Sequence, residues 1–348
     1  MTEKNIHKPL MTESCVTHLW SQPKFEFLNS EHFNGEKFTN LSPLGEKTPA
    51  FDLYKWVMSR KSSTWNVDIA KEYELANQIS QKPESRAETS LDDWNVWFIG
   101  HATALIKIGP YNFLTDPVWA EYASPKQGFG PQRVCPAGIR LEDLPHIDAV
   151  LLSHNHYDHM DIATLKWLHE KFGMMIYTGL GNSFYMPKEF NVTELDWWES
   201  IHFNGLSITY TPAQHGSGRG FRDQDRALWG GFSISSGKDH CYFAGDTGYA
   251  HHFKEIKKRL GAPRIALLPI GAYEPRDILK FMHMNPEDAF QAHQDLHAKC
   301  SLAIHYRTFQ LTDESREQPE HELHKAMQHS SKLVNPFYCI REGKKLIV

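Results

Sequence analysis

Four side chains able to bind a metal ion lie within six residues of one another in the segment SHNHYDH (153–159). A regular helix or strand cannot turn four side chains at this H-x-H-x-D-H spacing toward one point, whereas a tight loop can. Two metal ions would divide the ligands naturally, with His154 and His156 on one ion and Asp158 and His159 on the other. The plainer alternative, a solvated polar loop, is disfavoured because the pattern directly follows a buried apolar run.

Further candidate ligands stand where later predicted strands end. The predicted strand 206–211 leads into His215, the strand 240–244 into Asp246, and the strand 301–304 into His305. A histidine at the end of one strand is more often an ordinary surface or core residue. Together with the first cluster, however, these three residues indicate one shared site at an edge of a sheet.

The elements that must position these residues can be predicted from the spacing of apolar side chains. Early strands follow one another closely, and later strands alternate with helices, which indicates an α/β (α+β) fold. Strands are expected at 96–108, 111–115, 149–152, 174–177, 206–211, 228–234, 240–244, 265–269 and 301–304, and helices at 161–172, 249–260, 286–297 and 319–330.

The first ninety or so residues differ from this regular part of the chain. They hold aromatic residues among polar turns and end in the charged stretch KPESRAETSLDD. We therefore expect residues 1–90 to form an N-terminal extension that packs on a catalytic domain at 91–348. Within the extension, residues 51–60 could form an amphipathic helix, which either packs on the catalytic domain or lies on a membrane surface.

The composition narrows the class of protein. The chain has 348 residues, of which 41% are hydrophobic and 23% charged, as in ordinary globular proteins. Its net charge of −5 disfavours a nucleic-acid binder. The five cysteines are scattered without CxxC spacing. No apolar run suits a signal peptide or a membrane-spanning helix. We therefore expect a cytoplasmic protein with reduced thiols.

The order of the motifs HNHYDH, AQH, GDTG and AIH resembles the metallo-β-lactamase superfamily of binuclear metal hydrolases. The segments GHATALIKI, FLTDPVW, LWGGF, FAGDTGY, LPIGAYEPR and MHMNPEDA are similar to the N-acylphosphatidylethanolamine-hydrolysing phospholipase D family and its bacterial relatives. The similar motifs run from about residue 96 to 309. The resemblance implies an αββα sandwich with the metal ions at one edge of its two sheets.

The resemblance also implies a ligand set of seven residues. Zinc suits these imidazole and carboxylate ligands, and their type alone also allows manganese or iron. The diiron members of the superfamily carry a glutamate at the position of His156, so the histidine here favours zinc. One ion would be held by His154, His156 and His215, the other by Asp158, His159 and His305, and Asp246 would bridge both.

Three further residues are predicted to support this site. Asp116 would hydrogen-bond a ligand histidine and fix its tautomer, the alternative being a turn-forming aspartate before proline. His101 would either hydrogen-bond a ligand in the same way or serve the fold alone. His283 matches a family histidine near the substrate phosphate, and would bind a phosphoryl oxygen or protonate the leaving group. Its alternative is a loop histidine before a helix.

Two departures from the family pattern concern the wall of the site. The chain has Gly216 where members usually have tryptophan, and it has Tyr306 and Arg307 where they usually have Trp-Gly. Both changes leave the predicted ligands intact, and they bear on the substrate.

The resulting functional prediction is a binuclear zinc phosphodiesterase of phospholipase D type. Asp158 and Asp246 would orient the attacking water, and the products would be phosphatidic acid and an N-acylethanolamine. Two zinc ions, two aspartates and a hydroxide leave a net charge of about +1, which favours an anionic phosphodiester. The alternatives are a lactonase or other hydrolase of the superfamily and a non-catalytic metal-binding regulatory protein. The expected partner is a phospholipid or another small phosphodiester, and no nucleic acid is expected. The resemblance is compatible with a homodimer. Peripheral contact with a membrane is a further alternative.

Overall fold

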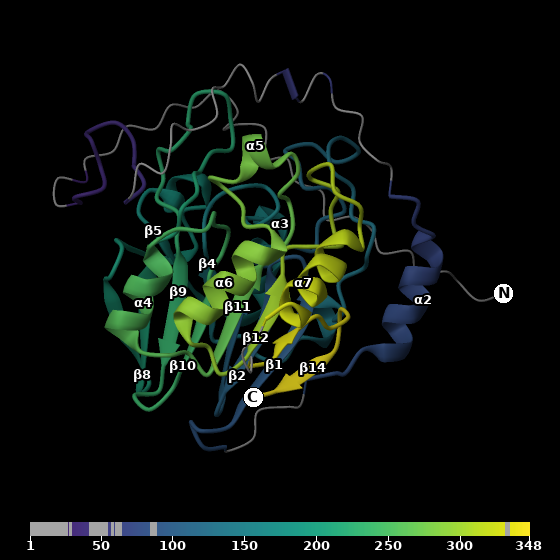
Figure 1. Cartoon of the computed structure of the whole chain (residues 1–348). Helices are drawn as coiled ribbons and strands as arrows, with labels where there is room; N and C mark the ends of the chain where they lie inside the picture. The colour runs from purple at the N-terminus through teal and green to yellow at the C-terminus, as the bar shows by residue number, and fades with distance from the viewer. Residues whose placement is uncertain are drawn as a thin grey trace.

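Two mixed seven-stranded sheets face each other, and helices cover their outer faces (Figure 1). The computed structural model describes residues 27, 30–41, 55–56, 59, 65–83, 89–330 and 335–348. The first sheet has the order β14 (Lys345–Ile347), β1 (Trp94–Gly100), β2 (Thr103–Ile108), β3 (Tyr111–Thr115), β4 (Ala149–Leu152), β5 (Met175–Gly179), β6 (Asn191–Leu195). The second has the order β13 (Phe337–Tyr338), β12 (Ser301–Ile304), β11 (Ile265–Pro269), β10 (His240–Phe243), β9 (Gly231–Ser235), β8 (Leu206–Thr211), β7 (Ser200–Phe203).

Strand β1 shows how the sequence builds these layers. Successive side chains of a strand point to opposite faces, and in β1 both faces are apolar. Val96 and Phe98 belong to the core between the sheets. Trp97 and Ile99 belong to a second core, which lies under the outer helix of the first sheet. A strand buried on both faces is expected only in the interior of a layered sandwich.

The helices close the two outer faces. Helix α3 (Ile162–Phe172) begins at Asp161, which caps the backbone amides of Ala163 and Thr164, and it covers the first sheet. Helices α4 (His252–Leu260), α6 (Pro286–Leu296) and α7 (Gln318–Gln328) lie in a row across the second sheet (Figure 1). These layers confirm the predicted αββα sandwich. The remaining described helices are α2 (Ile69–Ile79), α5 (Arg276–Leu279), η2 (Leu141–Asp143) and η3 (Asn182–Tyr185).

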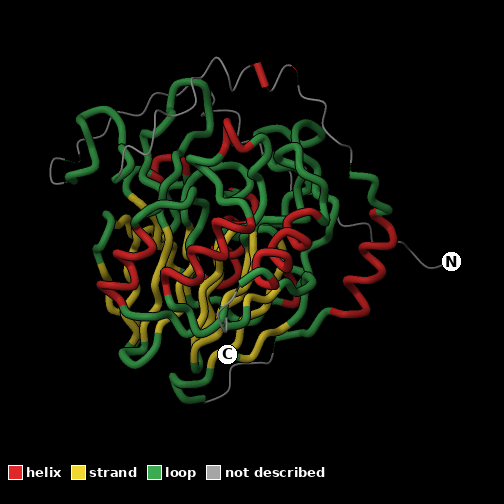
Figure 2. Tube along the Cα trace, viewed as in Figure 1, coloured by secondary structure: helices red, strands yellow, loops and turns green. Residues whose placement is uncertain are grey.

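Strand direction brings the predicted site residues to one edge. In the first sheet β1, β3 and β4 run the same way, because β1 and β3 are both antiparallel to β2 and β4 is parallel to β3. In the second sheet β8, β10 and β12 likewise share one direction. Each of these six strands is followed by one of the loops that carry site residues. Figure 2 shows the strands in the lower part of the molecule, with long loops gathered at one edge.

The prediction of one strand over 96–108 is wrong. The chain folds back on itself after Gly100, and β1 and β2 pair as an antiparallel hairpin. His101 lies in the turn with a positive φ of 56°. The segment is mostly apolar because β1 and β2 are both interior strands, so hydrophobicity alone does not reveal the turn.

The described residues before 91 contact the rest of the chain at several points. Glu72 of α2 accepts hydrogen bonds from Arg316 and Arg341, and the bond from Arg316 is the main cause that lowers the pKa of Glu72 to about 2. Trp56 donates a hydrogen bond of 2.6 Å to Asp313. These contacts support the expected packing of residues 1–90 on a catalytic domain, which stays a prediction. The predicted helix at 51–60 lies mostly outside the described residues.

Among the described helices, none combines the length and the apolar character needed to cross a membrane.

Candidate metal centre

The loops at the shared edge bring all seven predicted ligands together. Their side chains come from the ends of β4, β8, β10 and β12. The loop after β4 is not solvated, since the exposed fraction is 1% for His154 and 0% for His159. Burial of so many polar side chains is costly unless they are paired or bind an ion. The solvated-loop alternative is therefore wrong.

Three imidazoles form the first group of potential ligands. They belong to His154, His156 and His215, and their ligand atoms all lie within 4.8 Å of one another. His154 Nε2 lies 2.8 Å from His156 Nδ1, which in turn lies 3.3 Å from His215 Nε2. His215 Nδ1 donates a hydrogen bond of 2.9 Å to the carbonyl oxygen of Met282. This bond fixes the ring so that Nε2 faces the group.

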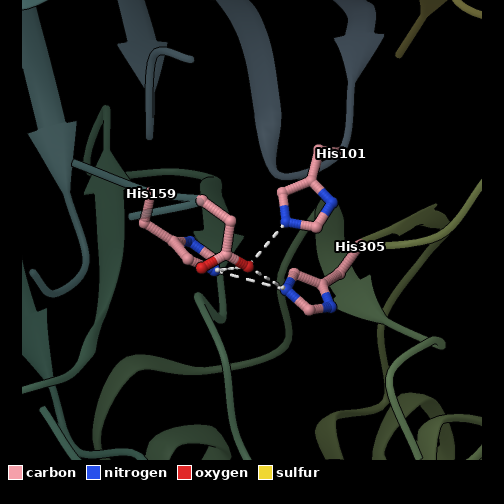
Figure 3. Close-up of side chains that lie close together, drawn as sticks. His101, His159 and His305 are labelled. Carbon is pink, nitrogen blue, oxygen red and sulfur yellow. Dashed lines mark hydrogen bonds and ion pairs between the residues drawn. The ribbon is translucent and has the colours of Figure 1, made fainter. Parts of the chain in front are cut away.

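The second group gathers around the Asp158 carboxylate. Asp158 Oδ2 lies 3.3 Å from both His159 Nε2 and His305 Nε2, and 2.9 Å from His101 Nε2. Figure 3 shows the rings of His101, His159 and His305 converging from three directions. His101 therefore lies within hydrogen-bond distance of the predicted ligand Asp158, in agreement with the interpretation that it hydrogen-bonds a ligand.

Asp246 lies between the two groups. Its Oδ2 atom is 3.2 Å from His159 Nε2, 3.1 Å from His305 Nε2 and 3.8 Å from His215 Nε2. Its other oxygen, Oδ1, is buried without a hydrogen-bond partner in the described structure. A residue that faces both groups and keeps an unpaired buried oxygen is suited to bridge two cations.

The donor spacing fits metal coordination. Zinc–nitrogen bonds of 2.0–2.1 Å in a tetrahedral arrangement separate neighbouring ligand atoms by about 3.3 Å. The closest donor pairs in both groups lie 2.8–3.3 Å apart. Five histidines and two aspartates without a ligand cysteine are a hard-to-intermediate donor set, which zinc, iron and manganese accept.

The electrostatics of the site favour positive charge at its centre. Burial opposes ionisation of Asp246, yet the imidazoles of His159 and His305 hold its pKa well below its usual range. Burial likewise opposes a charge on His305, but Asp246 and Asp158 raise its pKa to about 9. The two carboxylates thus draw protons onto the neighbouring rings, and divalent cations would satisfy the same demand.

Asp116 makes the contacts expected of a residue that orients a ligand. Its carboxylate is fully buried and accepts hydrogen bonds from the amide and the hydroxyl of Ser153, at 2.7 and 2.6 Å. It also lies 2.6 Å from His159 Nδ1. A proton held on Nδ1 leaves Nε2 of His159 with its lone pair toward the second group. The turn-forming alternative does not account for these bonds.

The backbone is strained where the site is assembled. His101, Asp116 and His305 adopt positive φ angles of 56°, 31° and 61°, which residues other than glycine rarely do. Each of the three follows the last residue of a strand. Such conformations persist only when the surrounding structure imposes them, and they concentrate at functional sites.

His283 lies beside the two groups, in the loop before α6. Its Nδ1 atom is 3.8 Å from Asp246 Oδ2 and has no hydrogen-bond partner among the described residues. Its ring packs edge-on against that of His215, with 5.0 Å between centroids. Burial lowers the pKa of His283 to about 4. An imidazole nitrogen beside the candidate metal centre without a partner is available to a substrate.

Two residues of the site were not predicted. Ser153 hydrogen-bonds Asp116 and lies 2.9 Å from His154 Nδ1. Asn40 accepts from the His215 amide and donates to its carbonyl oxygen, at 3.1 and 3.0 Å. Ser153 could have been found from its place before the first ligand, whereas Asn40 carries no local signal.

Comparison with known families agrees with this geometry. The family model described as "Beta-lactamase superfamily domain" matches residues 111–306, more than half of the chain. N-acyl-phosphatidylethanolamine-hydrolyzing phospholipase D 1 of Caenorhabditis elegans is 39% identical over 227 residues, which are 62% of this chain and 64% of that protein. The mitochondrial N-acyl-phosphatidylethanolamine-hydrolyzing phospholipase D of Saccharomyces cerevisiae is 31% identical over 275 residues, 74% of this chain and 58% of that one.

Solved structures show the same fold. Igni18, a metallo hydrolase of the archaeon Ignicoccus hospitalis, matches with a TM-score of 0.57 and 21% identity, over 74% of this chain and 98% of Igni18.

The match to the two phospholipases is partial: the chain spans about three fifths of the length of each.

Proposed function

The chain belongs to the β-lactamase superfamily, and from this premise we propose that it is a metal-dependent hydrolase, specifically a binuclear zinc phosphodiesterase of phospholipase D type. One observation carries the proposal: two groups of buried ligands share Asp246, whose carboxylate faces both. In this assignment His154, His156 and His215 hold one zinc ion, while Asp158, His159 and His305 hold the other.

Each residue then has a chemical task. Two bound zinc ions would lower the pKa of a water molecule to about 7 and stabilise charge on the phosphoryl oxygens. Asp158 and Asp246 would orient the attacking water toward phosphorus. His283 donates from its unpaired nitrogen to a phosphoryl oxygen. His101 and Asp116 hold Asp158 and His159 in place.

The proposed substrate class is an N-acylphosphatidylethanolamine-like phospholipid, cleaved to phosphatidic acid and an N-acylethanolamine. The similarity to the two phospholipases supports this class. The charge of the loaded site supports it too, since a net charge of about +1 attracts an anionic diester more than a neutral lactone. Acting on such a lipid, the chain would work in the cytoplasm in peripheral contact with a membrane.

We expect elemental analysis of the purified chain to give about two zinc ions per chain. Chelation should remove activity and lower the melting temperature together, because metal binding adds to the free energy of folding. Activity is measured on a panel of a phospholipid diester, a lactone and RNA. A single metal ion at full occupancy would remove the binuclear mechanism, and hydrolysis of the lactone alone would remove the phosphodiesterase assignment.

The role of His283 predicts a loss of turnover without loss of metal. Replacing His283 with alanine should lower kcat/KM by about 10- to 100-fold, the value of one hydrogen bond to a charged group. A nitrophenyl phosphodiester and a phospholipid should suffer alike, because both present the same anionic oxygens. Steady-state kinetics on both substrates and elemental analysis provide the measurement.

The matched control for this variant is His251→Ala, since His251 is exposed just before α4. It should keep full activity. A loss confined to the phospholipid would instead assign His283 to protonation of the leaving group, and loss of zinc would make it a structural residue.

A further inference from the structure

A separate cluster of potential metal ligands lies between α7 and β13. It comprises Glu320, His324 and Cys339, whose ligand atoms all lie within 4.8 Å of one another. Glu320 and His324 are one helical turn apart on α7, so their side chains share a face. Cys339 directly follows β13, the strand that pairs with β12. The fold, rather than local spacing in the sequence, therefore brings the three side chains together.

The helix that carries two of these residues packs on the core, and the cluster itself is accessible to solvent. Pro319 and Leu323 are buried and hold α7 against the core. Glu320 and Cys339 are half-buried, whereas His324 is exposed. Bond lengths of 2.0–2.3 Å would place zinc ligands about 3.3–3.6 Å apart in a tetrahedral site.

The donor set is one that zinc prefers. Thiolate, imidazole and carboxylate are all zinc ligands, and three protein ligands leave a fourth position for water. Arg307 Nη1 lies 3.4 Å from Glu320 Oε2, so one carboxylate oxygen is hydrogen-bonded while the other is available. Ligating carboxylates in metal sites commonly carry such a bond.

We propose that Glu320, His324 and Cys339 form a third metal site, which binds one zinc ion independently of the candidate metal centre. A bound ion would cross-link α7 to the edge of the second sheet. The site differs chemically from the candidate metal centre, whose donors are nitrogen and oxygen alone. A thiolate ligand therefore gives it a spectroscopic signature that the other two ions lack.

Cobalt(II) is the probe, titrated into the full chain after dialysis against a chelator has removed bound metal. We expect a thiolate-to-cobalt charge-transfer band in the near ultraviolet that grows to saturation as cobalt is added and disappears when zinc is added. Cys339→Ser should abolish the band. His324→Ala and Glu320→Gln should each weaken cobalt binding by at least about tenfold. Replacing a residue that hydrogen-bonds a metal ligand typically costs at least this much affinity, and the loss of the ligand itself costs no less.

Two control variants keep the test specific. Cys300→Ser removes another half-buried thiol, which donates to the carbonyl oxygen of Arg264 and lies outside the cluster; the band should remain. Asp246→Asn disrupts only the candidate metal centre, so the band should again remain and the two sites can fail separately. Absence of the band in the unaltered chain, or its persistence in Cys339→Ser, would overturn the proposal. Because His324 is exposed, an effect of its replacement cannot be assigned to misfolding.

Discussion

Replacing Asp246 with asparagine is expected to lower kcat/KM by more than about 100-fold and to release at least one metal ion. This loss exceeds the one that typically follows when a residue that only hydrogen-bonds a metal ligand is replaced. The Asp246 carboxylate is within 3.2 Å of both His159 and His305 and faces the first group through His215. An amide is neutral and cannot offset the charge of two cations. Steady-state kinetics and elemental analysis on the same preparation measure both effects.

Asp116→Asn is the matched control for this prediction. Asp116 is as buried as Asp246, but it contacts His159 and Ser153 rather than both groups of ligands. Losing a residue that orients a ligand typically costs about 10- to 100-fold. We therefore expect a smaller loss with both metal ions retained. Equal losses in the two variants at full metal content would contradict the bridging role.

An alanine at Gly271 is expected to damage the fold and the site together. Gly271 follows β11, and an added methyl group would overlap the carbonyl oxygen of His305 and lie 3.1 Å from Cβ of Tyr306. Overpacking of this kind typically costs about 1–3 kcal/mol. Displacing a ligand by about 1 Å can also cost about 100-fold in rate. Urea unfolding and kcat/KM on the same variant give the two measurements.

Gly173→Ala separates backbone strain from displacement of the site. Gly173 ends α3 with a φ of 61°, and nothing lies within 4 Å of an added methyl group. A left-handed alanine costs about 1–2 kcal/mol, so stability should fall while activity is kept. If Gly271→Ala also kept its activity, the dependence of the site on the position of His305 would be refuted.

The candidate site was predictable because its ligands are tied to features that are local in sequence. The strands at 149–152, 206–211, 265–269 and 301–304 have the predicted bounds, and each is a short segment in which apolar side chains recur. Their ends therefore marked where His215 and His305 would stand. The fold then had only to bring parallel strand ends to one edge, as layered α/β proteins do.

What could not be predicted depends on contacts between distant residues. The turn at His101 interrupts a largely apolar segment, and the hydrogen bond from the His101 amide to Thr308 links this turn to the loop after β12 in the other sheet. Strands β13 and β14 have two and three residues and exist only through pairing with β12 and β1. Tyr306, one of the departures from the family pattern, also depends on a distant residue, because its ring stacks on Phe98 in the core between the sheets.

The pairing of β14 with β1 has a consequence for folding during synthesis. Trp97 pairs with Lys345, so a ribosome must add nearly 250 residues after β1 before its partner exists. Until then β1 exposes an unpaired edge, which can recruit strands from other nascent chains. Closing so long a loop also costs entropy before any contact repays it, which slows the final step of assembly. Aggregation during expression should therefore depend on how quickly the last strand becomes available.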